Sequence, residues 1–253
     1  MRAFAAAFRA HLRNTAARPM FQVVILAQPV VTGTVAWFVY REAGIPQAAA
    51  FAVLGSGLAG VWSAATFSSA GDMDRERWAG TLQLAFASPT PVWLLASARA
   101  AAVMVLSVSA LAVGVGYATL VLRVPFDLQT PPAFWLALLL FLVGTNLFAL
   151  SLANLFLISR RTAILQNFLE WPLLLVTGIL FPLSAVPGWA GAVGALLPMR
   201  WAAEAVLSSA QGLPAGRALA LAAAAAAGWY LIALLLFPVV ERRVRRSASL
   251  ELA

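Results

Sequence analysis

The chain has 253 residues, of which 62% are hydrophobic and 10% are charged, with a formal net charge of +8. Soluble globular domains contain roughly 45–50% apolar and about 25% charged residues, so this composition predicts an integral membrane protein of the all-α class. Cysteine and lysine are absent, and His11 is the only histidine. These absences exclude thiolate chemistry, a histidine-based triad or metal site, and the lysine of a phosphate-binding P-loop. We therefore expect no catalytic residue and no metal ligands in this chain.

The N-terminal segment, residues 1–19, precedes the first long apolar run and has a two-sided helical pattern. Three arginines share one side of a helical wheel, and three large apolar residues lie on a neighbouring side. These residues are Arg2, Arg9 and Arg13, and Phe4, Phe8 and Leu12. The pattern predicts an amphipathic helix on the cytoplasmic side that lies in the membrane interface.

Six apolar runs follow, each long enough to cross a bilayer, which takes roughly 17–25 residues of helix. They cover residues 20–40, 47–70, 92–122, 134–158, 163–183 and 217–240. We therefore expect a polytopic domain of six transmembrane helices over residues 20–240, followed by a basic tail over residues 241–253. The third run is overlong and contains Arg99, so its apolar part is predicted to begin near Ala100.

The 17 arginines are distributed unevenly between the two sides that these six runs define. Thirteen fall on the side of both termini and of the segment between the second and third runs, and four fall on the other side. Because cytoplasmic segments carry an excess of basic residues, both termini are predicted to be cytoplasmic. Basic residues at helix ends also account for the net charge, so nucleic acid is not expected as a partner.

Residues 72–83 form a short charged segment between the second and third runs. A segment this dense in charge cannot face lipid and has too little apolar surface to fold by itself, which favours docking to a partner. Trp78 and Leu82 stand four residues apart and would form its apolar ridge, while Gly80 predicts a bend or a helix end. The candidate docking residues are Asp74, Arg75, Glu76, Arg77, Trp78, Gly80, Thr81, Leu82 and Gln83. The alternative is an ordinary solvated loop, which charge alone would favour.

Polar residues inside the first and fifth runs are candidates for lining a translocation path. They are Gln28, Thr32, Asn167, Glu170 and Thr177. A carboxylate at the bilayer centre costs roughly 2.5–3.5 kcal/mol on insertion scales, so Glu170 must face protein or water. Two interpretations stay open for it, a contact in the path or an interfacial acid paired with Arg160 or Arg161. For the other residues, hydrogen bonding between helices is the alternative.

Residues 184–216, between the fifth and sixth runs, form the longest segment that does not span. Prolines and tryptophans interrupt its small apolar residues, which predicts short helices on the outer face of the membrane. The interrupting residues are Pro187, Trp189, Pro198, Trp201 and Pro214.

Two motifs carry a resemblance to a known family. The first is E-R-W-A-G-T-L-Q at residues 76–83 with Ser88 and Pro89 after it, similar to the pattern E-R-x-x-G-T-L-E and T/S-P. The second runs from Gly178 to Ala205 and is similar to S-G-x-x-F-P-x-x-x-x-P-x-W and N-P-x-x-x-x-x-E-A. By this resemblance it is an outer-face motif, whose candidate residues are Phe181, Pro182, Pro187, Trp189, Pro198 and Glu204. Over nearly its whole length the chain resembles the permease subunit of type 2 ABC transporters. It departs from the family pattern at three positions, namely Gln83, Met199 and Leu207.

The resemblance implies an all-helical, non-catalytic permease subunit of an ATP-driven exporter in the bacterial plasma membrane. Residues 72–83 would contain the coupling helix, and the first, second and fifth spans would line the path. The implied partners are two ABC ATPase subunits, which would hold ATP and Mg²⁺, and a second permease copy, either identical or a close paralogue, in a membrane of lipid. Apolar walls would suit a lipid-like or amphipathic cargo, such as a drug, a lipid or a lipid-linked glycan.

A second class of function stays open from the sequence, namely an ion- or proton-coupled secondary transporter. Such a protein needs ionisable residues near the middle of the membrane, and Glu170 is the candidate. A membrane-embedded enzyme is disfavoured, because no cysteine, lysine or intramembrane histidine is present to serve as nucleophile or base.

Overall fold

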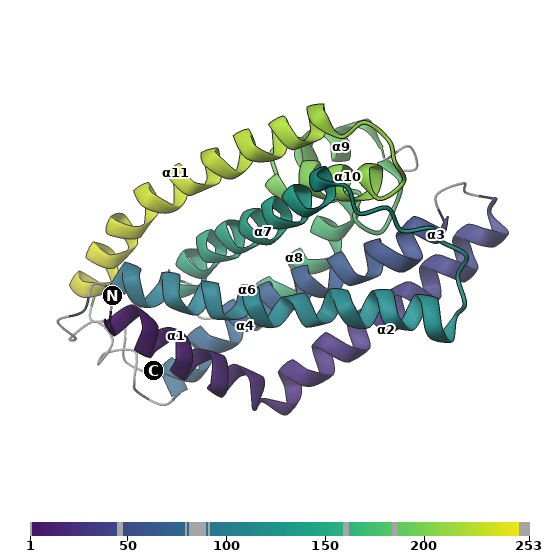
Figure 1. Ribbon diagram of the computed structural model, residues 1–253. Helices are drawn as coiled ribbons and strands as arrows, with labels where there is room; N and C mark the ends of the chain where they lie inside the picture. Colours follow the sequence, from purple (N-terminus) through teal and green to yellow (C-terminus); the bar gives the residue numbers. More distant parts are fainter. Residues whose placement is uncertain are drawn as a thin grey trace.

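The computed structural model describes residues 2–44, 48–78, 80, 90, 92–158, 162–183 and 187–247, which are helical apart from short connections and contain no strand. Figure 1 shows long helices lying side by side, with short helices packed at one end. The elements are α1 Arg2–Ala16, α2 Pro19–Glu42, α3 Ala48–Ala50, the π-helix η1 Phe51–Gly55, α4 Ser56–Trp78, α6 Val92–Gly116, the π-helix η2 Tyr117–Val121, α7 Pro132–Ile158, α8 Thr162–Thr177, α9 Gly188–Ala195, α10 Pro198–Ser209 and α11 Gly216–Ser247.

Among the described residues, five helical stretches are long and apolar enough to cross a membrane. They are Pro19–Glu42, Ala48–Ser68, Trp93–Val121, Pro132–Leu152 and Gly216–Leu236. They confirm a multi-pass, all-helical membrane protein and correspond to five of the six predicted spans.

The fifth predicted span, residues 163–183, is shorter in the structure than the apolar run. Helix α8 has 16 residues and ends at Thr177. At 1.5 Å per residue it is about 24 Å long, less than the roughly 30 Å of a hydrocarbon core. The reason is local: Gly178 adopts a left-handed backbone with φ of +71°, which terminates the helix, and Pro182 follows it. Hydrophobicity alone did not reveal this break.

Helix α4 is the central helix of the bundle and contacts α2, α6, α7 and α8. In the stretch Ala48–Ser68, 94% of the apolar window is buried. Two glycines permit this packing, because a Cβ atom at Gly57 would lie 2.7 Å from Leu111 Cδ1 and one at Gly60 would lie 2.9 Å from Ala110 Cβ. These glycines therefore allow α4 to lie close against α6.

An aromatic stack ties three helices together across the core. The ring centroids of Trp62 on α4 and Phe148 on α7 are 5.7 Å apart, and those of Phe148 and Trp229 on α11 are 4.6 Å apart. The second pair is edge-to-face, the arrangement that aromatic quadrupoles favour. This stack fixes the position of α4 relative to the last helix.

The segment between α8 and α11 folds into α9 and α10, as the prediction of short helices required. Helix α10 packs on α7 and α11, and Pro198, its first residue, lies so close to Gly144 of α7 that a Cβ there would be 2.9 Å from Pro198 Cβ. Trp201 and Trp229 donate their indole hydrogens to Ala195 O at 2.9 Å and Leu196 O at 2.8 Å. These bonds make the segment a packed cap on one end of the bundle.

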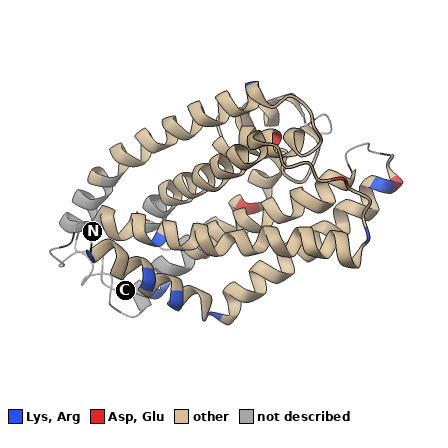
Figure 2. Ribbon diagram, viewed as in Figure 1, with Lys and Arg blue, Asp and Glu red and all other residues tan. Residues whose placement is uncertain are grey.

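Charged residues gather at the two ends of the molecule, and the middle of the bundle is almost free of them (Figure 2). Figure 1 shows that α1 and the C-terminal end of α11 lie at one end, while α9 and α10 lie at the other. Two ends rich in charge and an apolar middle are what a bilayer requires of a protein that spans it.

Helix α1 forms as predicted, but its apolar side is covered by protein. It packs along α6, with Phe4 and Phe8 half-buried and His11 and Thr15 buried. The Thr15 hydroxyl and His11 Nε2 lie 3.2 Å apart and share a hydrogen bond. The predicted side for lipid contact is thus the side that attaches α1 to the bundle, because packing on α6 buries the same apolar surface.

Candidate functional site

A hydrogen bond joins the second-run helix to the only acidic residue of α8. Ser63 Oγ on α4 donates to Glu170 Oε1 at a distance of 2.6 Å. Glu170 lies eight residues after the start of α8, about 12 Å along its axis, and is half-buried. Of the two interpretations of Glu170, the partners Arg160 and Arg161 fall outside the described residues. The structure therefore places the carboxylate against α4, inside the helix bundle.

Gln28 of α2 lies at nearly the same depth as this pair. A Cβ atom at Gly60 would lie 3.3 Å from Pro29 Cδ, so these two residues face each other across α2 and α4. Ser63 is three residues from Gly60 and Gln28 is one residue from Pro29, and both lie toward the same end, because the helices are antiparallel. The two side chains are therefore within about 3 Å of each other in depth.

Two buried side-chain amides, one close to Glu170 in the sequence of α8 and one at a similar depth on α2, have donors that no described residue satisfies. Gln28 Nε2 and Gln166 Nε2 are buried without a hydrogen-bond partner in the described part of the chain. Gln166 is 6% exposed and stands one turn before Glu170, on the same side of α8. An unmet buried donor is costly, so such groups call for a water or a ligand. We call Gln28, Ser63, Gln166 and Glu170 the polar belt around α4.

Four of the five predicted path residues are at least partly buried in the bundle, and the fifth is exposed. Gln28 and Glu170 belong to the polar belt, and Thr177 lies further along the same side of α8 as Glu170, buried. Thr32 is also buried, but its hydroxyl donates to Gln28 O at 2.7 Å and so is satisfied within its own helix. Asn167 is exposed on another side of α8. Exposure distinguishes Asn167 from the other four residues, which are at least partly buried.

Sequence reasoning missed Ser63 and Gln166. Ser63 could have been found from its spacing, because Ser56, Gly60 and Ser63 recur every three or four residues on one side of the second run. Gln166 precedes Glu170 by four residues and shares its side of the helix. The pairing of Ser63 with Glu170 had no signal in the sequence, because 107 residues separate them.

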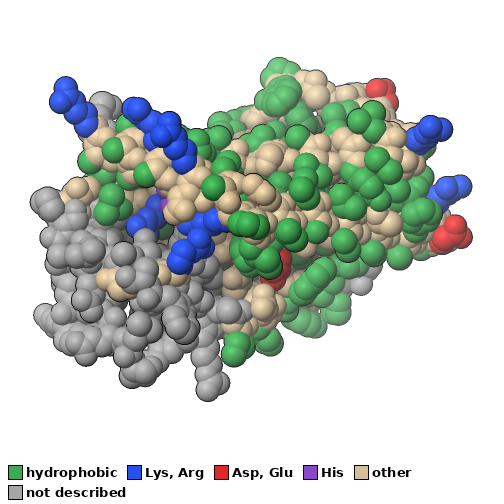
Figure 3. Space-filling view, turned by 90° about the horizontal axis from the view of Figure 1, so that it is seen from below, with side chains coloured by type: hydrophobic (Ala, Val, Ile, Leu, Met, Phe, Trp, Pro, Cys, Tyr) green, Lys and Arg blue, Asp and Glu red, His purple; other side chains and the backbone are tan. Residues whose placement is uncertain are grey.

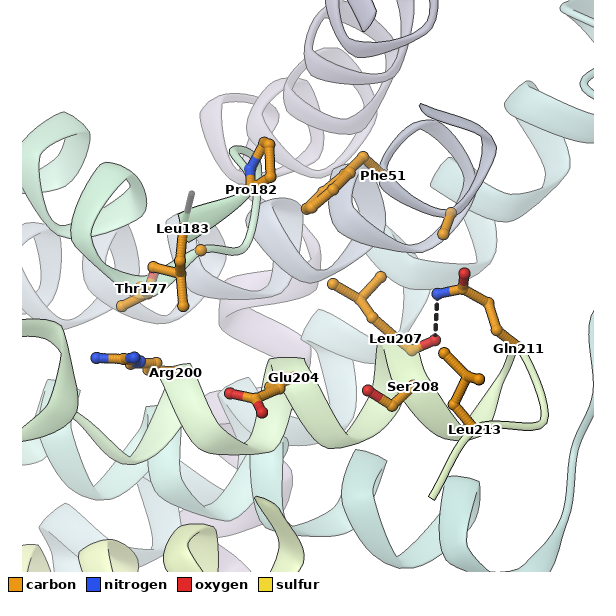
Figure 4. A pocket seen from close by; sticks show the side chains of 12 residues that line it. Phe51, Thr177, Pro182, Leu183, Arg200, Glu204, Leu207, Ser208, Gln211 and Leu213 are labelled. Atoms are coloured by element: carbon orange, nitrogen blue, oxygen red, sulfur yellow. Dashed lines mark hydrogen bonds between the residues drawn. The ribbon is translucent and has the colours of Figure 1, made fainter. Parts of the chain in front are cut away.

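A cavity of about 260 Å³ lies at the capped end of the bundle, between η1, α8 and α10. Figure 4 shows Phe51, Pro182 and Leu183 on one side of it and Glu204, Ser208 and Gln211 on the other. The remaining lining residues are Ala50, Thr177, Gly178, Arg200, Leu207 and Leu213. The cavity brings together Thr177, predicted for the path, and two residues of the outer-face motif, Pro182 and Glu204.

Of the polar side chains that line this cavity, Arg200 and Gln211 are hydrogen-bonded to backbone carbonyls, whereas Glu204 is exposed. Arg200 donates through Nη1 to Gly191 O, and its guanidinium carbon lies 4.6 Å from the centroid of the Trp201 ring. Gln211 Nε2 donates to Leu207 O at 2.7 Å. The Glu204 side chain is exposed. The cavity thus joins an apolar wall to a wall with a carboxylate and hydroxyl groups, an amphipathic lining.

The other residues of the outer-face motif either pack against α2 or lie at the start of α9. The Phe181 ring packs edge-on against Tyr40 of α2 with centroids 6.1 Å apart, and the Tyr40 hydroxyl donates to Leu180 O at 2.6 Å. Pro187 precedes the first residue of α9, and Trp189 in α9 is 68% exposed. The turn after α8 is therefore pinned to α2.

The charged segment at residues 72–83 is described only in part. Helix α4 runs without interruption to Trp78, and Gly80 after it has φ of +64°, so the helix end predicted near Gly80 is confirmed. Arg75 is exposed. The side chains of Asp74, Glu76, Arg77 and Trp78 lie outside the described part, as do Thr81, Leu82 and Gln83 entirely. The continuous helix places Trp78 about 22 Å from Ser63 along one axis.

Among the described residues, no three His, Cys, Asp or Glu side chains come together in a way that could hold a metal ion.

The comparisons with known proteins agree with this architecture. The profile of the family described as ABC-2 type transporter matches residues 2–210, from α1 to the end of α10. A comparison with curated proteins gives no match.

Proposed function

This chain belongs to the ABC-2 type transporter family, and from this premise we propose that it is the permease subunit of an ATP-driven exporter. The observation that carries the proposal is the family match, which covers every element from α1 to α10. ATP and Mg²⁺ bind to separate partner subunits, since this chain lacks the lysine that a P-loop needs. Two such ATPase subunits serve two permease copies, which are identical or closely related.

In this proposal the chain crosses the bacterial plasma membrane six times, with both termini in the cytoplasm. The arginine distribution supports this orientation, since 13 of the 17 arginines fall on the side of the termini. Helix α8 is the fifth crossing, although it is about 24 Å long. The turn at residues 178–183, pinned to α2 by Tyr40, completes the crossing toward the outer face.

Docking of the ATPase subunits occurs at residues 72–83. The uninterrupted helix from Ser56 to Trp78 supports this step, because a rigid helix carries a displacement at one end to the other. Closure of the ATPase pair on ATP moves the cytoplasmic end of α4. That displacement reaches Ser63, and through its hydrogen bond it reaches Glu170 on α8.

The translocation path follows the polar belt around α4. Three helices contribute to it, α2, α4 and α8, which correspond to the first, second and fifth predicted spans. Its unmet amide donors on Gln28 and Gln166 and the carboxylate of Glu170 bind polar groups of the cargo. The apolar residues that form most of the surrounding surface favour a cargo with an apolar body, such as a lipid-like or amphipathic compound.

Purification from native membranes tests the proposal. The tagged chain is isolated in mild detergent, and co-purifying proteins and ATP hydrolysis are measured. We expect an ATPase subunit in the complex, and no ATP hydrolysis by the chain alone above a mock purification. Hydrolysis by the single chain contradicts the proposal. Transport that needs a proton gradient but no ATPase partner would instead favour the secondary transporter, with Glu170 as the titrating group.

A further inference from the structure

The cavity of about 260 Å³ at the capped end is distinct from the polar belt around α4. Thr177, which lines it, lies seven residues past Glu170, about 10 Å further along α8. Its lining comes from the start of η1, the end of α8, the turn after α8, and α10 with the loop that follows. Pockets that enclose a small ligand usually have roughly 300–1,000 Å³, so this cavity holds a polar headgroup and not a whole amphipathic compound.

The polar side chains that line this cavity differ in whether their hydrogen-bonding groups are already used. Thr177 and Gln211 each donate to a backbone carbonyl three or four residues before them. Arg200 Nε is buried and has no hydrogen-bond partner in the described part of the chain. Glu204 is exposed, and Ser208 is half-buried. A ligand in the cavity therefore meets one unmet cationic donor, a carboxylate and a hydroxyl group.

These three residues form one row along α10, because Arg200, Glu204 and Ser208 lie at intervals of four residues. The Arg200 guanidinium is fixed at the α9 end of the row. Its Nη1 donates to Gly191 O, and its central carbon lies 4.6 Å from the centroid of the Trp201 ring. Figure 4 shows the guanidinium pointing away from Glu204. The cavity thus has a positive and a negative residue about 6 Å apart along the helix axis.

An apolar wall stands opposite this row. Figure 4 shows Phe51 of η1 and Pro182 and Leu183 of the turn after α8 across the cavity from α10. The turn is held from behind, because the Tyr40 hydroxyl donates to Leu180 O at 2.6 Å. The wall is therefore in place before a ligand arrives, which lowers the entropic cost of binding.

The position of the cavity in the bundle matches the depth of lipid headgroups. Figure 3 shows hydrophobic side chains over the middle of one face of the molecule and charged side chains at its two ends. The cap formed by α9 and α10 lies at one of these ends. Trp189 in α9 is 68% exposed, and tryptophan is enriched where membrane meets water. A lipid beside the bundle can thus place its headgroup in the cavity.

We propose that the cavity at the capped end binds a phospholipid whose headgroup carries both a phosphate and a primary ammonium group, as phosphatidylethanolamine does. Arg200 Nε donates to a phosphate oxygen, and the ammonium group donates to the Glu204 carboxylate and the Ser208 hydroxyl. A headgroup with only a negative charge is repelled by Glu204, and one with only a positive charge is repelled by Arg200. The inference goes beyond the permease role and rests only on the placement of the bundle in a membrane.

Lipid binding to the purified, delipidated chain tests this inference. Native mass spectrometry measures dissociation constants for three lipids with the same acyl chains. They are phosphatidylethanolamine, anionic phosphatidylglycerol, and a lipid with a trimethylammonium headgroup and no phosphate. We expect phosphatidylethanolamine to bind about tenfold more tightly than either of the others, because it alone satisfies both charges. Equal affinities for the three lipids would overturn the inference.

The variant Glu204→Gln keeps the shape of the side chain and removes its charge. We expect it to lose about tenfold in affinity for phosphatidylethanolamine and to bind phosphatidylglycerol at least as tightly as the unmodified chain. Glu42→Gln is the matched control, because Glu42 is an exposed acid at the end of α2, outside the cavity lining. It should change neither affinity by more than about twofold. A Glu204→Gln variant that keeps the full preference contradicts the inference.

A second variant tests where the lipid binds. Ser208→Phe places a ring in the cavity from α10 and should abolish the tight binding of phosphatidylethanolamine, whereas unchanged binding would put the lipid elsewhere and refute the inference. If this variant does not fold, Glu204→Gln decides, because replacing an exposed side chain by its amide removes no packing.

Water-soluble glycerophosphoethanolamine distinguishes a lipid site from a site for the free headgroup. It lacks the acyl chains, so it should compete roughly a hundredfold less effectively than the lipid. Equal competition would identify a site for a soluble compound and overturn the assignment to a lipid. All of these measurements use the chain alone, so their failure leaves the exporter proposal intact, and failure to find an ATPase partner leaves the lipid result intact.

Discussion

The Ser63 hydroxyl lies 2.6 Å from the Glu170 carboxylate, and this bond links α4 to α8 inside the bundle. It is a contact between the helix that reaches the charged segment at residues 72–83 and the helix that reaches the cavity at the capped end through Thr177. A movement of α4 along its axis must change this bond. In the proposed mechanism, this hydrogen bond connects α4, which leads to the docking segment, with α8, which lines part of the cavity at the capped end.

We expect Ser63→Ala to lower the free energy of unfolding by about 1–2 kcal/mol, because the carboxylate loses a donor that is not replaced by water inside the bundle. Glu170→Gln should cost less, since its amide oxygen still accepts from Ser63. The measurement is thermal denaturation of the purified variants in detergent. In a double-mutant cycle, Ser63→Ala and Glu170→Ala, each of which removes the bond, should be non-additive. Additive effects would mean that the bond contributes nothing.

The same Glu170→Gln variant should retain the ATPase subunit but change transport of the cargo. The charge is removed while the shape and the hydrogen bond to Ser63 remain, so assembly at residues 72–83 is not affected. Transport into inverted membrane vesicles is measured for the variant, with co-purification of the ATPase as control. Unchanged transport rates for every cargo tested would place Glu170 outside the path.

Trp78→Ala should weaken association with the ATPase subunit by about 2 kcal/mol, as expected when a central aromatic residue is removed from an interface. Glu76→Arg should weaken it further through charge reversal. Trp189→Ala is the matched control, because Trp189 is 68% exposed in α9 at the opposite end of the bundle. Co-purification is measured at equal membrane abundance. Normal binding by the Trp78→Ala, Glu76→Arg double variant would identify the segment as a solvated loop.

Ser69→Pro should uncouple ATP hydrolysis from transport. Proline in a helix interior costs about 3 kcal/mol or more and kinks the helix, here between Ser63 and Trp78. We expect the ATPase subunit to bind and to hydrolyse ATP while cargo movement falls at least tenfold. Ser69→Ala is the control and should transport normally. Full transport by the proline variant would show that the continuity of α4 is not needed.

The predicted orientation is tested with single cysteines, because the chain contains none of its own. The Gln129→Cys variant should react with an impermeant thiol reagent in whole cells. The Met73→Cys variant should react only after the membrane is permeabilised. Gln129 lies in the exposed connection between η2 and α7. The opposite labelling pattern would reverse the topology and place the termini outside.

The sequence by itself determined the helical class, the positions of five spans and the end of α4 near Gly80. These features are local: an apolar run of sufficient length, or a glycine that admits a left-handed backbone, has the same effect in any surrounding structure. The arginine side of α1 was also correctly assigned from helical spacing. Membership of the family followed from two short motifs, which the match over residues 2–210 confirmed.

Only the tertiary structure decided which surfaces are covered and which polar groups meet. It buried the apolar side of α1 on α6, ended α8 at Thr177, and formed the cavity at the capped end from η1, α8 and α10. It also brought Ser63 to Glu170 across 107 residues of chain. The physical reason is that an apolar run is equally stable against lipid and against another helix, so hydrophobicity does not tell which of its sides packs on protein.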